Sequence, residues 1–185
     1  MFIQVKNLTK QFKNNIAVNK ISFSIKKNQT MGLLGANGCG KTTSIGMMLG
    51  LIKPTNGEII IDNQNINESS RVNILSRMNF ASPYVELPKK LTVRQNLEVY
   101  GRLYNVKNLK LKILQLSDEL NIKSFLDKKT GELSSGQKNR VTLAKSLIND
   151  PEILFLDEPT ASLDPDIGDF VRNYIEDYKS KNKVS

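Results

Sequence analysis

Apolar and polar residues alternate in two runs over positions 2–25, and Lys13-Asn14-Asn15 separates the runs. A period of two is typical of strands with one buried face. The segment therefore predicts a β-hairpin with Ile21, Phe23 and Ile25 on one face. Four shorter apolar runs predict further strands, over 30–34, 58–62, 77–80 and 152–156.

Helical spacing dominates the middle of the chain. Leu91-Thr92-Val93-Arg94-Gln95 has the form of a capping box, and Leu97, Tyr100 and Tyr104 follow at helical spacing. Other helices are predicted over 41–51, 109–120, 134–149 and 166–180. The predicted fold class is therefore α/β, with a mostly helical insert at about 82–148.

Length and composition exclude several classes of protein. A chain of 185 residues fits a single domain, and it holds no apolar run near the roughly 20 residues that span a bilayer. Its first residues lack the charged-then-apolar order of a signal peptide, so we expect the cytoplasm. One cysteine and no histidine exclude an internal disulfide, a cysteine-rich zinc site and histidine-based catalysis.

The net charge of +9 raises the question of an anionic partner. The lysines are scattered, and the aromatic residues, at 6%, are not interleaved with them as a platform for stacking bases requires. We therefore expect no nucleic-acid partner. A solvated surface near anionic lipid is the better interpretation.

The segment Gly35-Ala36-Asn37-Gly38-Cys39-Gly40-Lys41-Thr42 matches the phosphate-loop pattern G-x-x-x-x-G-K-[ST], with a predicted strand before it and a predicted helix after it. Glycines let successive N–H groups turn towards phosphate oxygens, and the helix N-terminus adds its dipole. Lys41 would supply a charge for the β- and γ-phosphates, and the Thr42 hydroxyl is a candidate ligand for Mg²⁺. The alternative is a chance glycine turn. Cys39 permits a redox role, but a small residue at a variable loop position is the simpler interpretation.

Four apolar residues precede Asp157 and Glu158, so a buried strand delivers two carboxylates to the end of a sheet. Asp157 is a candidate to hold Mg²⁺, and Glu158 to orient or deprotonate an attacking water molecule. Acidic pairs at strand ends are common, and this interpretation therefore depends on the glycine loop.

Leu133-Ser134-Ser135-Gly136-Gln137 opens another helix and presents hydroxyl and N–H groups at its positive end. This would be a second phosphate site in a chain that already has one. A head-to-tail dimer would place it on the γ-phosphate of the partner. The alternative is an ordinary helix start rich in serine and glycine.

These three motifs, in this order and spacing, resemble the nucleotide-binding domain of an ATP-binding cassette (ABC) protein over essentially the whole chain. The resemblance implies a P-loop fold with an N-terminal antiparallel β-subdomain, a parallel core sheet and a helical signature insert. It implies ATP and Mg²⁺ as cofactors, with Thr42 and Asp157 as metal ligands and Lys41 and Glu158 in catalysis. It implies that ATP contacts Phe12, Gly35, Ala36, Asn37, Gly38, Cys39, Gly40, Lys41, Thr42 and Thr43, and that Ser134, Ser135, Gly136, Gln137 and Asp164 contact the partner's ATP. Phe12 would stack on adenine, or else be a core residue of the hairpin.

The chain departs from the family pattern in two places. The family usually has a glutamine after the strand at 77–80, and this chain has Ser82, a polar substitute at best; the loop still offers Tyr84, Val85 and Leu87 to a membrane partner. The family also continues after the last helix with a strand and a histidine, which this chain lacks. We therefore expect a truncated cassette with a gap in its central sheet.

The resemblance favours the ATP-binding and ATP-hydrolysing subunit of an ABC transporter. Its partners would be a second cassette, in a homodimer or heterodimer, and a transmembrane permease, on the inner face of the cell membrane. The turn at 51–58 and the LTVRQNL helix start resemble exporter cassettes. Two alternatives stay open: a soluble ABC ATPase acting on nucleic acid or ribosomes, and a cassette that binds ATP without efficient hydrolysis.

Overall fold

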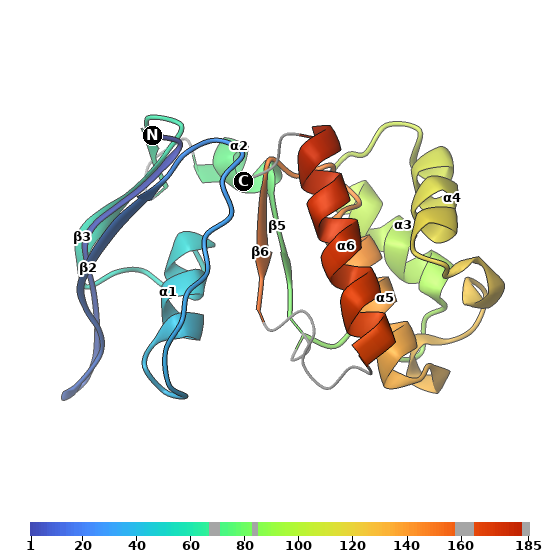
Figure 1. Cartoon of the computed structure of the whole chain (residues 1–185), viewed down its shortest axis with the longest axis horizontal. Helices are drawn as coiled ribbons and strands as arrows, with labels where there is room; N and C mark the ends of the chain where they lie inside the picture. The colour runs from blue at the N-terminus through green and yellow to red at the C-terminus, as the bar shows by residue number, and fades with distance from the viewer. Residues whose placement is uncertain (67–70, 83–84, 158–164, 183–185) are drawn as a thin grey trace. The chain divides into compact units, whose positions relative to one another are not determined.

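The computed structural model describes residues 1–66, 71–82, 85–157 and 165–182 (Figure 1). The chain divides into two compact units, Met1–Met78 and Asn79–Asn182, and each is described by itself. The expectation of a single domain over 1–185 stays a prediction.

The first unit is built on an antiparallel sheet in the order β2-β1-β3-β4. Phe12 pairs with Asn15, so two residues make the turn between the first two strands, and Lys13 there has φ 51°. The hairpin prediction is confirmed. The elements of this unit are β1 (Ile3–Phe12), β2 (Asn15–Ile25), α1 (Lys41–Met48), β3 (Asn56–Ile61), β4 (Gln64–Asn65) and α2 (Arg71–Ser76).

One face of this sheet and the helix α1 form the core of the first unit. Ile3 and Val5 of β1 are buried at alternate positions, as the period of two predicts, and Ile59 of β3 joins them. Met47 and Met48 supply the buried side of α1. The sheet thereby gives α1, and the loop that precedes it, a fixed support.

The strand predicted over 30–34 is wrong, because this segment has no regular structure. No strand of the described residues pairs with it, and Leu34 is 96% exposed. Apolar residues form a strand only when a neighbour satisfies their backbone N–H and C=O groups. The helix predicted over 41–51 is also shorter than expected: α1 ends at Met48, and Gly50 follows with φ 66°.

The second unit contains one pair of strands and four helices within its described residues. The amide of Asp157 donates to the carbonyl of Ala81 over 2.9 Å. Both residues lie at the carboxyl ends of their strands, so β5 and β6 run parallel, as expected. The elements are β5 (Met78–Ala81), α3 (Val93–Leu103), α4 (Leu109–Glu119), short 3-10 turns at Lys123–Phe125 and Thr130–Glu132, α5 (Ser135–Ser146), β6 (Ile153–Leu156) and α6 (Pro165–Asn182).

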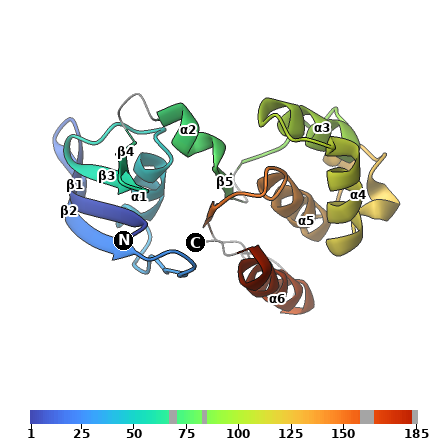
Figure 2. The same cartoon turned by 90° about the horizontal axis from the view of Figure 1, so that it is seen from above.

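The capping box predicted at the start of α3 is confirmed. The Thr92 hydroxyl accepts the amide of Gln95 over 3.1 Å, and the Gln95 side chain accepts the amide of Thr92 over 2.9 Å. Val93 and Leu97 are buried on the inner side of the helix. Figure 2 shows α3 beside α4 and α5 in the second unit.

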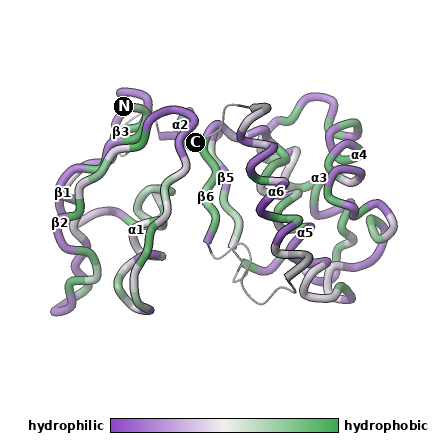
Figure 3. Tube along the Cα trace, in the orientation of Figure 1, coloured by the Kyte–Doolittle hydropathy of each residue, from purple (hydrophilic) through white to green (hydrophobic). Residues whose placement is uncertain are grey.

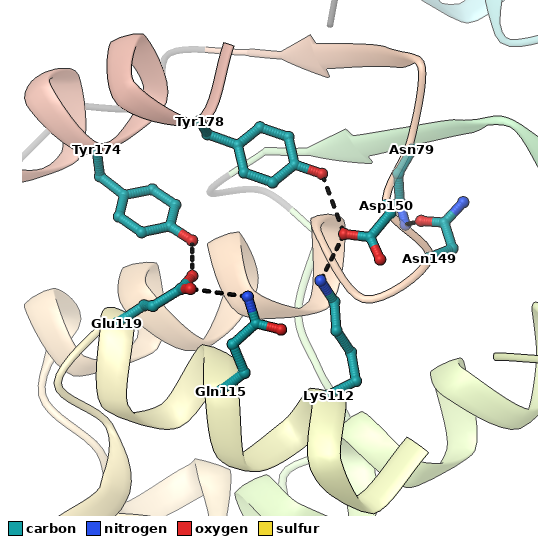
Figure 4. Close-up of polar contacts among 8 residues, drawn as sticks. All are labelled: Asn79, Lys112, Gln115, Glu119, Asn149, Asp150, Tyr174 and Tyr178. Carbon is teal, nitrogen blue, oxygen red and sulfur yellow. Dashed lines mark hydrogen bonds and ion pairs between the residues drawn. The ribbon is translucent and has the colours of Figure 1, made fainter. Parts of the chain in front are cut away.

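Two tyrosines attach α6 to the rest of the second unit (Figure 4). The Tyr174 hydroxyl donates to Glu119 of α4 over 2.6 Å, and the Tyr178 hydroxyl lies 3.5 Å from Asp150, which also pairs with Lys112. Burial, followed by the nearby carboxylates, raises the pKa of both phenols above its ordinary value. None of the described helices combines the length and apolar character needed to cross a membrane.

Candidate functional site

The glycine loop lies in the first unit, between the exposed segment 30–34 and α1. Gly38 and Gly40 have φ 81° and φ 96°, in the left-handed region that favours glycine. A Cβ atom on Gly40 would lie 2.2 Å from the carbonyl oxygen of Ala17 and 3.1 Å from Val18 Cγ2. Gly40 therefore lets the loop lie directly against β2, and a larger residue does not fit there.

The Lys41 side chain folds back over this loop. Its ammonium donates to the carbonyl oxygens of Gly35 over 2.7 Å and of Ala36 over 3.0 Å. The amide of Cys39 closes the turn onto Ala36 over 3.3 Å. The ammonium is thus held against the backbone of the loop.

The first turn of α1 keeps the character of an anion site. Gly40 is its N-cap, no side-chain hydrogen bond caps the turn, and no acidic residue lies in it. Uncapped N–H groups and the helix dipole favour an anion at such an end. Thr42 is exposed and Thr43 half-buried, so both hydroxyls lie at this end of the helix.

A cleft of about 380 Å³ runs along β2 beside the glycine loop. Its walls include Ala17, Val18 and Asn19 from β2 and Gly38 and Lys41 from the loop. The sequence predicts the hairpin but carries no signal that β2 faces the loop, and these β2 residues were missed for that reason. The contact is recognised from the structure, where a Cβ atom added to Gly40 would overlap the carbonyl oxygen of Ala17 in β2.

Phe12 is 47% exposed at the end of β1, with the Lys10 ammonium 4.9 Å from the centre of its ring. The alternative that it is a core residue of the hairpin is therefore wrong. Its stacking on adenine stays a prediction. Cys39 is an exposed free thiol, and its Sγ would lie 2.5 Å from a Cβ atom on Gly35.

The segment 133–137 forms a second capping box, at the start of α5. The Ser134 hydroxyl accepts the amide of Gln137 over 3.2 Å, and the Gln137 side chain accepts the amide of Ser134 over 3.1 Å. Ser135 is exposed, and Gly136 is buried beneath it. A capping box is also what an ordinary helix start forms, so the phosphate role of these residues stays a prediction.

Asp157 is buried at the carboxyl end of β6, as the sequence predicts. Of the described side chains, the buried Ser82 hydroxyl hydrogen-bonds to its carboxylate, over 3.4 Å. Ser82 therefore contacts the predicted metal ligand from the position where the family has glutamine. Glu158 and Asp164 lie outside the described residues, as does Tyr84. Thr42 and Asp157 belong to different units, and their joint use stays a prediction.

Lys145 of α5 is a residue that the sequence analysis missed. Its ammonium donates to the Asn79 side chain over 3.2 Å and to the carbonyl of Phe80 over 3.1 Å, and it lies 5.0 Å from the centre of the Tyr100 ring. Burial lowers its pKa, because its described partners are neutral. A mid-helix lysine gives no sequence signal of this kind. The contact attaches α5 to β5, directly before Ser82.

Comparison with known proteins gives concordant matches. A family model described as "ABC transporter" matches residues 18–161. The chain is 38% identical over 165 residues to the Nod factor export ATP-binding protein I of Burkholderia orbicola, covering 88% of this chain and 54% of that protein. It is equally similar, at 38%, to the probable multidrug ABC transporter ATP-binding protein YbhF of Escherichia coli, with 88% and 28% covered. The chain thus spans about half, or less, of these relatives.

Solved structures with the same fold include a dimeric ATP-binding cassette bound to ADP and phosphate. It aligns with a TM-score of 0.88 and 26% identity, over 98% of this chain and 85% of that chain. A Clostridium perfringens protein that is part of an ABC transporter complex aligns with a TM-score of 0.82 and 28% identity, over 99% and 76%. The P-loop fold class predicted from the sequence is confirmed.

Proposed function

The chain belongs to the ABC transporter family, and we propose that it binds ATP at its glycine loop and hydrolyses it to power a separate membrane subunit. One observation carries this proposal: the loop lies against β2 at Gly40, and the carbonyl oxygens of the loop at Gly35 and Ala36 hold the Lys41 ammonium. A loop of this shape offers N–H groups and one mobile charge to a polyphosphate. The named ABC ATP-binding relatives support it.

Within this proposal the residues at 35–43 contact different parts of the ATP molecule. The N–H groups of the loop and of the first turn of α1 surround the β- and γ-phosphates, and Lys41 leaves its two carbonyl partners to meet them. Phe12 stacks on the adenine, and the cleft along β2 accommodates the nucleoside. Asn37 in the loop and Thr43 in the first turn of α1 are proposed to present their N–H groups.

The residues present fit Mg²⁺, which ATP-hydrolysing cassettes use. Thr42 and Asp157 offer a hydroxyl and a carboxylate, the hard oxygen ligands that Mg²⁺ prefers. The carboxylate of Asp157 is buried at the end of β6 and is contacted there by the Ser82 hydroxyl, itself an oxygen donor. When bound, the ion neutralises charge on the phosphates. Glu158 would orient the attacking water or take its proton.

The signature segment is proposed to act on the ATP of a second cassette. Ser134 keeps its hydroxyl proton for donation because its oxygen accepts from Gln137, and Ser135 is exposed beside it. Asp164 is proposed to reach across the same interface. The dimeric cassette with the same fold supports a second copy as the partner. The membrane subunit, and a location at the inner face of the membrane, rest on the transporter relatives.

One observation favours a second candidate, a cassette that binds ATP without efficient hydrolysis. Ser82 is buried and its short side chain contacts Asp157, whereas the longer glutamine of the family extends to metal and water. A chain with this substitution keeps its phosphate loop and loses one group that orients the reacting water.

Titration calorimetry with ATP and Mg²⁺ tests the binding step. Lys41→Ala is expected to weaken binding about 10- to 100-fold, since a charge-assisted contact is lost. Lys20→Ala removes an exposed lysine of the same unit and serves as the matched control, with unchanged affinity. Equal affinity of the Lys41 variant and the wild type would refute the loop assignment. Phosphate release by the wild type decides between the two candidates.

A further inference from the structure

Two leucines and several basic side chains are exposed at the corner between α3 and α4. We call this surface the hairpin tip and define it by Arg102, Leu103, Lys107, Lys110 and Leu111. Leu103 is 71% exposed and Leu111 is 67% exposed. Residues 99–117 include four basic side chains and no acidic one. Figure 3 shows the alternation of hydrophobic and hydrophilic residues along α4.

The positive charges of the hairpin tip are not used inside the second unit. Within the described part of the chain, Arg102, Lys107 and Lys110 form no ion pair, and all three are exposed. Lys112, the next basic residue, differs from them, because it pairs with Asp150 and its side chain is 11% exposed. The hairpin tip therefore presents cations without an ion pair among the described residues, whereas Lys112 stabilises the second unit through its pair with Asp150.

The backbone that carries the tip is fixed. The amide of Val106 donates to the carbonyl of Gly101 over 2.9 Å, and that of Tyr104 to Tyr100 over 3.1 Å. A Cβ atom on Gly101 would lie 2.1 Å from Leu109 Cδ1, so the two helices are in close contact at this point. The leucines are thus held outward by a packed corner.

We propose that the hairpin tip binds the surface of an anionic phospholipid membrane. Lysine and arginine stems bury their methylene groups at such a surface while the charged heads reach phosphate groups. Exposed leucines beside them enter the boundary between headgroups and acyl chains. The proposal commits to lipid because scattered leucines on a basic, acid-free corner suit a deformable anionic surface. Lipid binding by the hairpin tip does not require ATP binding at the glycine loop, so an experiment can refute either proposal without refuting the other.

Co-sedimentation with vesicles, in the absence of nucleotide, tests this binding. The protein is expected to sediment with vesicles of phosphatidylcholine and phosphatidylglycerol and not with phosphatidylcholine alone. Replacing both Lys107 and Lys110 by Glu is expected to reduce binding about 25-fold or more, since each basic residue near the surface contributes about fivefold. The matched control reverses Lys128 and Lys129, an exposed pair of the same unit.

A second pair of variants tests the leucines. Leu103→Ser with Leu111→Ser is expected to weaken binding that persists at high salt, where surface charges are screened. Leu51→Ser, at a residue 75% exposed in the first unit, is the control and should bind like the wild type. Inorganic phosphate at the same phosphate concentration should not displace the protein from vesicles.

Four results would overturn the proposal, and three of them come from the vesicle experiments. These three are an equal loss in the Lys128 and Lys129 control, equal binding to uncharged vesicles, and displacement by inorganic phosphate. Binding to polyglutamate without binding to anionic vesicles would also overturn it, since it would assign the tip to an acidic protein. Circular dichroism of each variant establishes that the fold is intact.

Discussion

Substitution of Gly40 by Ala tests the contact on which the candidate site depends. The new Cβ atom would lie 2.2 Å from the carbonyl oxygen of Ala17, about 1 Å inside an ordinary contact, on a backbone with φ 96°. The oxygen belongs to the paired strand β2, so no side-chain rotation relieves the overlap. Either the loop moves away from β2, or β2 bends.

Substitutions at two other glycines distinguish the cost of the positive φ from the cost of the steric overlap. Gly38→Ala has the positive φ without the overlap, because no atom lies within 4 Å of its Cβ position, and strain alone costs about 1–2 kcal/mol. Gly32→Ala introduces neither the positive φ nor an overlap. It is expected to raise the free energy of unfolding by about 0.4–1 kcal/mol, because alanine reduces the conformational entropy of the unfolded chain. Gly40→Ala combines strain with overpacking and is expected to cost about 3 kcal/mol or more.

Urea unfolding of the three variants without nucleotide, followed by circular dichroism, gives the free energies of unfolding. Amide hydrogen exchange then assigns the loss to the first unit, since the protection of β2 should fall in Gly40→Ala and persist in Gly38→Ala. Equal destabilisation by Gly38→Ala and Gly40→Ala would show that the loop does not lie against β2. The proposed nucleotide site would then lose its structural basis.

Two further predictions concern the second unit. Thr92→Ala is expected to lower the free energy of unfolding by about 1 kcal/mol through the lost cap, whereas Thr92→Ser keeps the hydroxyl and should retain stability; equal losses would contradict the cap. The raised pKa of Tyr174 means that its neutral form stabilises the fold at pH values up to its ordinary pKa of about 10, and that this contribution is lost as pH rises through the higher folded value. Tyr174→Phe should therefore reduce the alkaline fall in unfolding free energy, and an unchanged alkaline limb would contradict the burial of the phenol together with its contact with Glu119.

The features predicted correctly from the sequence are local ones. A capping box joins residues three positions apart, so Thr92 and Gln95 predict the start of α3 without any knowledge of the fold, whereas the box at Ser134 was not predicted as such. The hairpin is equally local, although its turn is one residue shorter than the predicted separator 13–15, because Asn15 already pairs with Phe12. The glycine loop is likewise recognised from residues 35–42 alone, but its role in binding phosphate stays a prediction, and its position against β2 depends on the contact between Gly40 and Ala17.

The features that were missed need distant partners. The segment 30–34 has the apolar residues of a strand, yet a strand exists only where another backbone pairs with it. The helix α2 and the strand β4 are too short to show a period in the sequence. The cleft along β2 arises where Ala17 meets Gly40, residues 23 positions apart that only the fold brings together.

Lys145 shows what a sequence pattern cannot supply even when every element is predicted. The strand β5 and the helix α5 were both expected, but the sequence does not show that a half-buried ammonium joins them through Asn79 and Phe80. Placing a charge among neutral partners costs free energy, which is offset here by two hydrogen bonds and the Tyr100 ring. Ser82 lies two residues beyond Phe80 and contacts Asp157. The helix that begins with the signature serine therefore also supports the strand that precedes Ser82, and α5 contributes to the position of both parts of the candidate site in its unit.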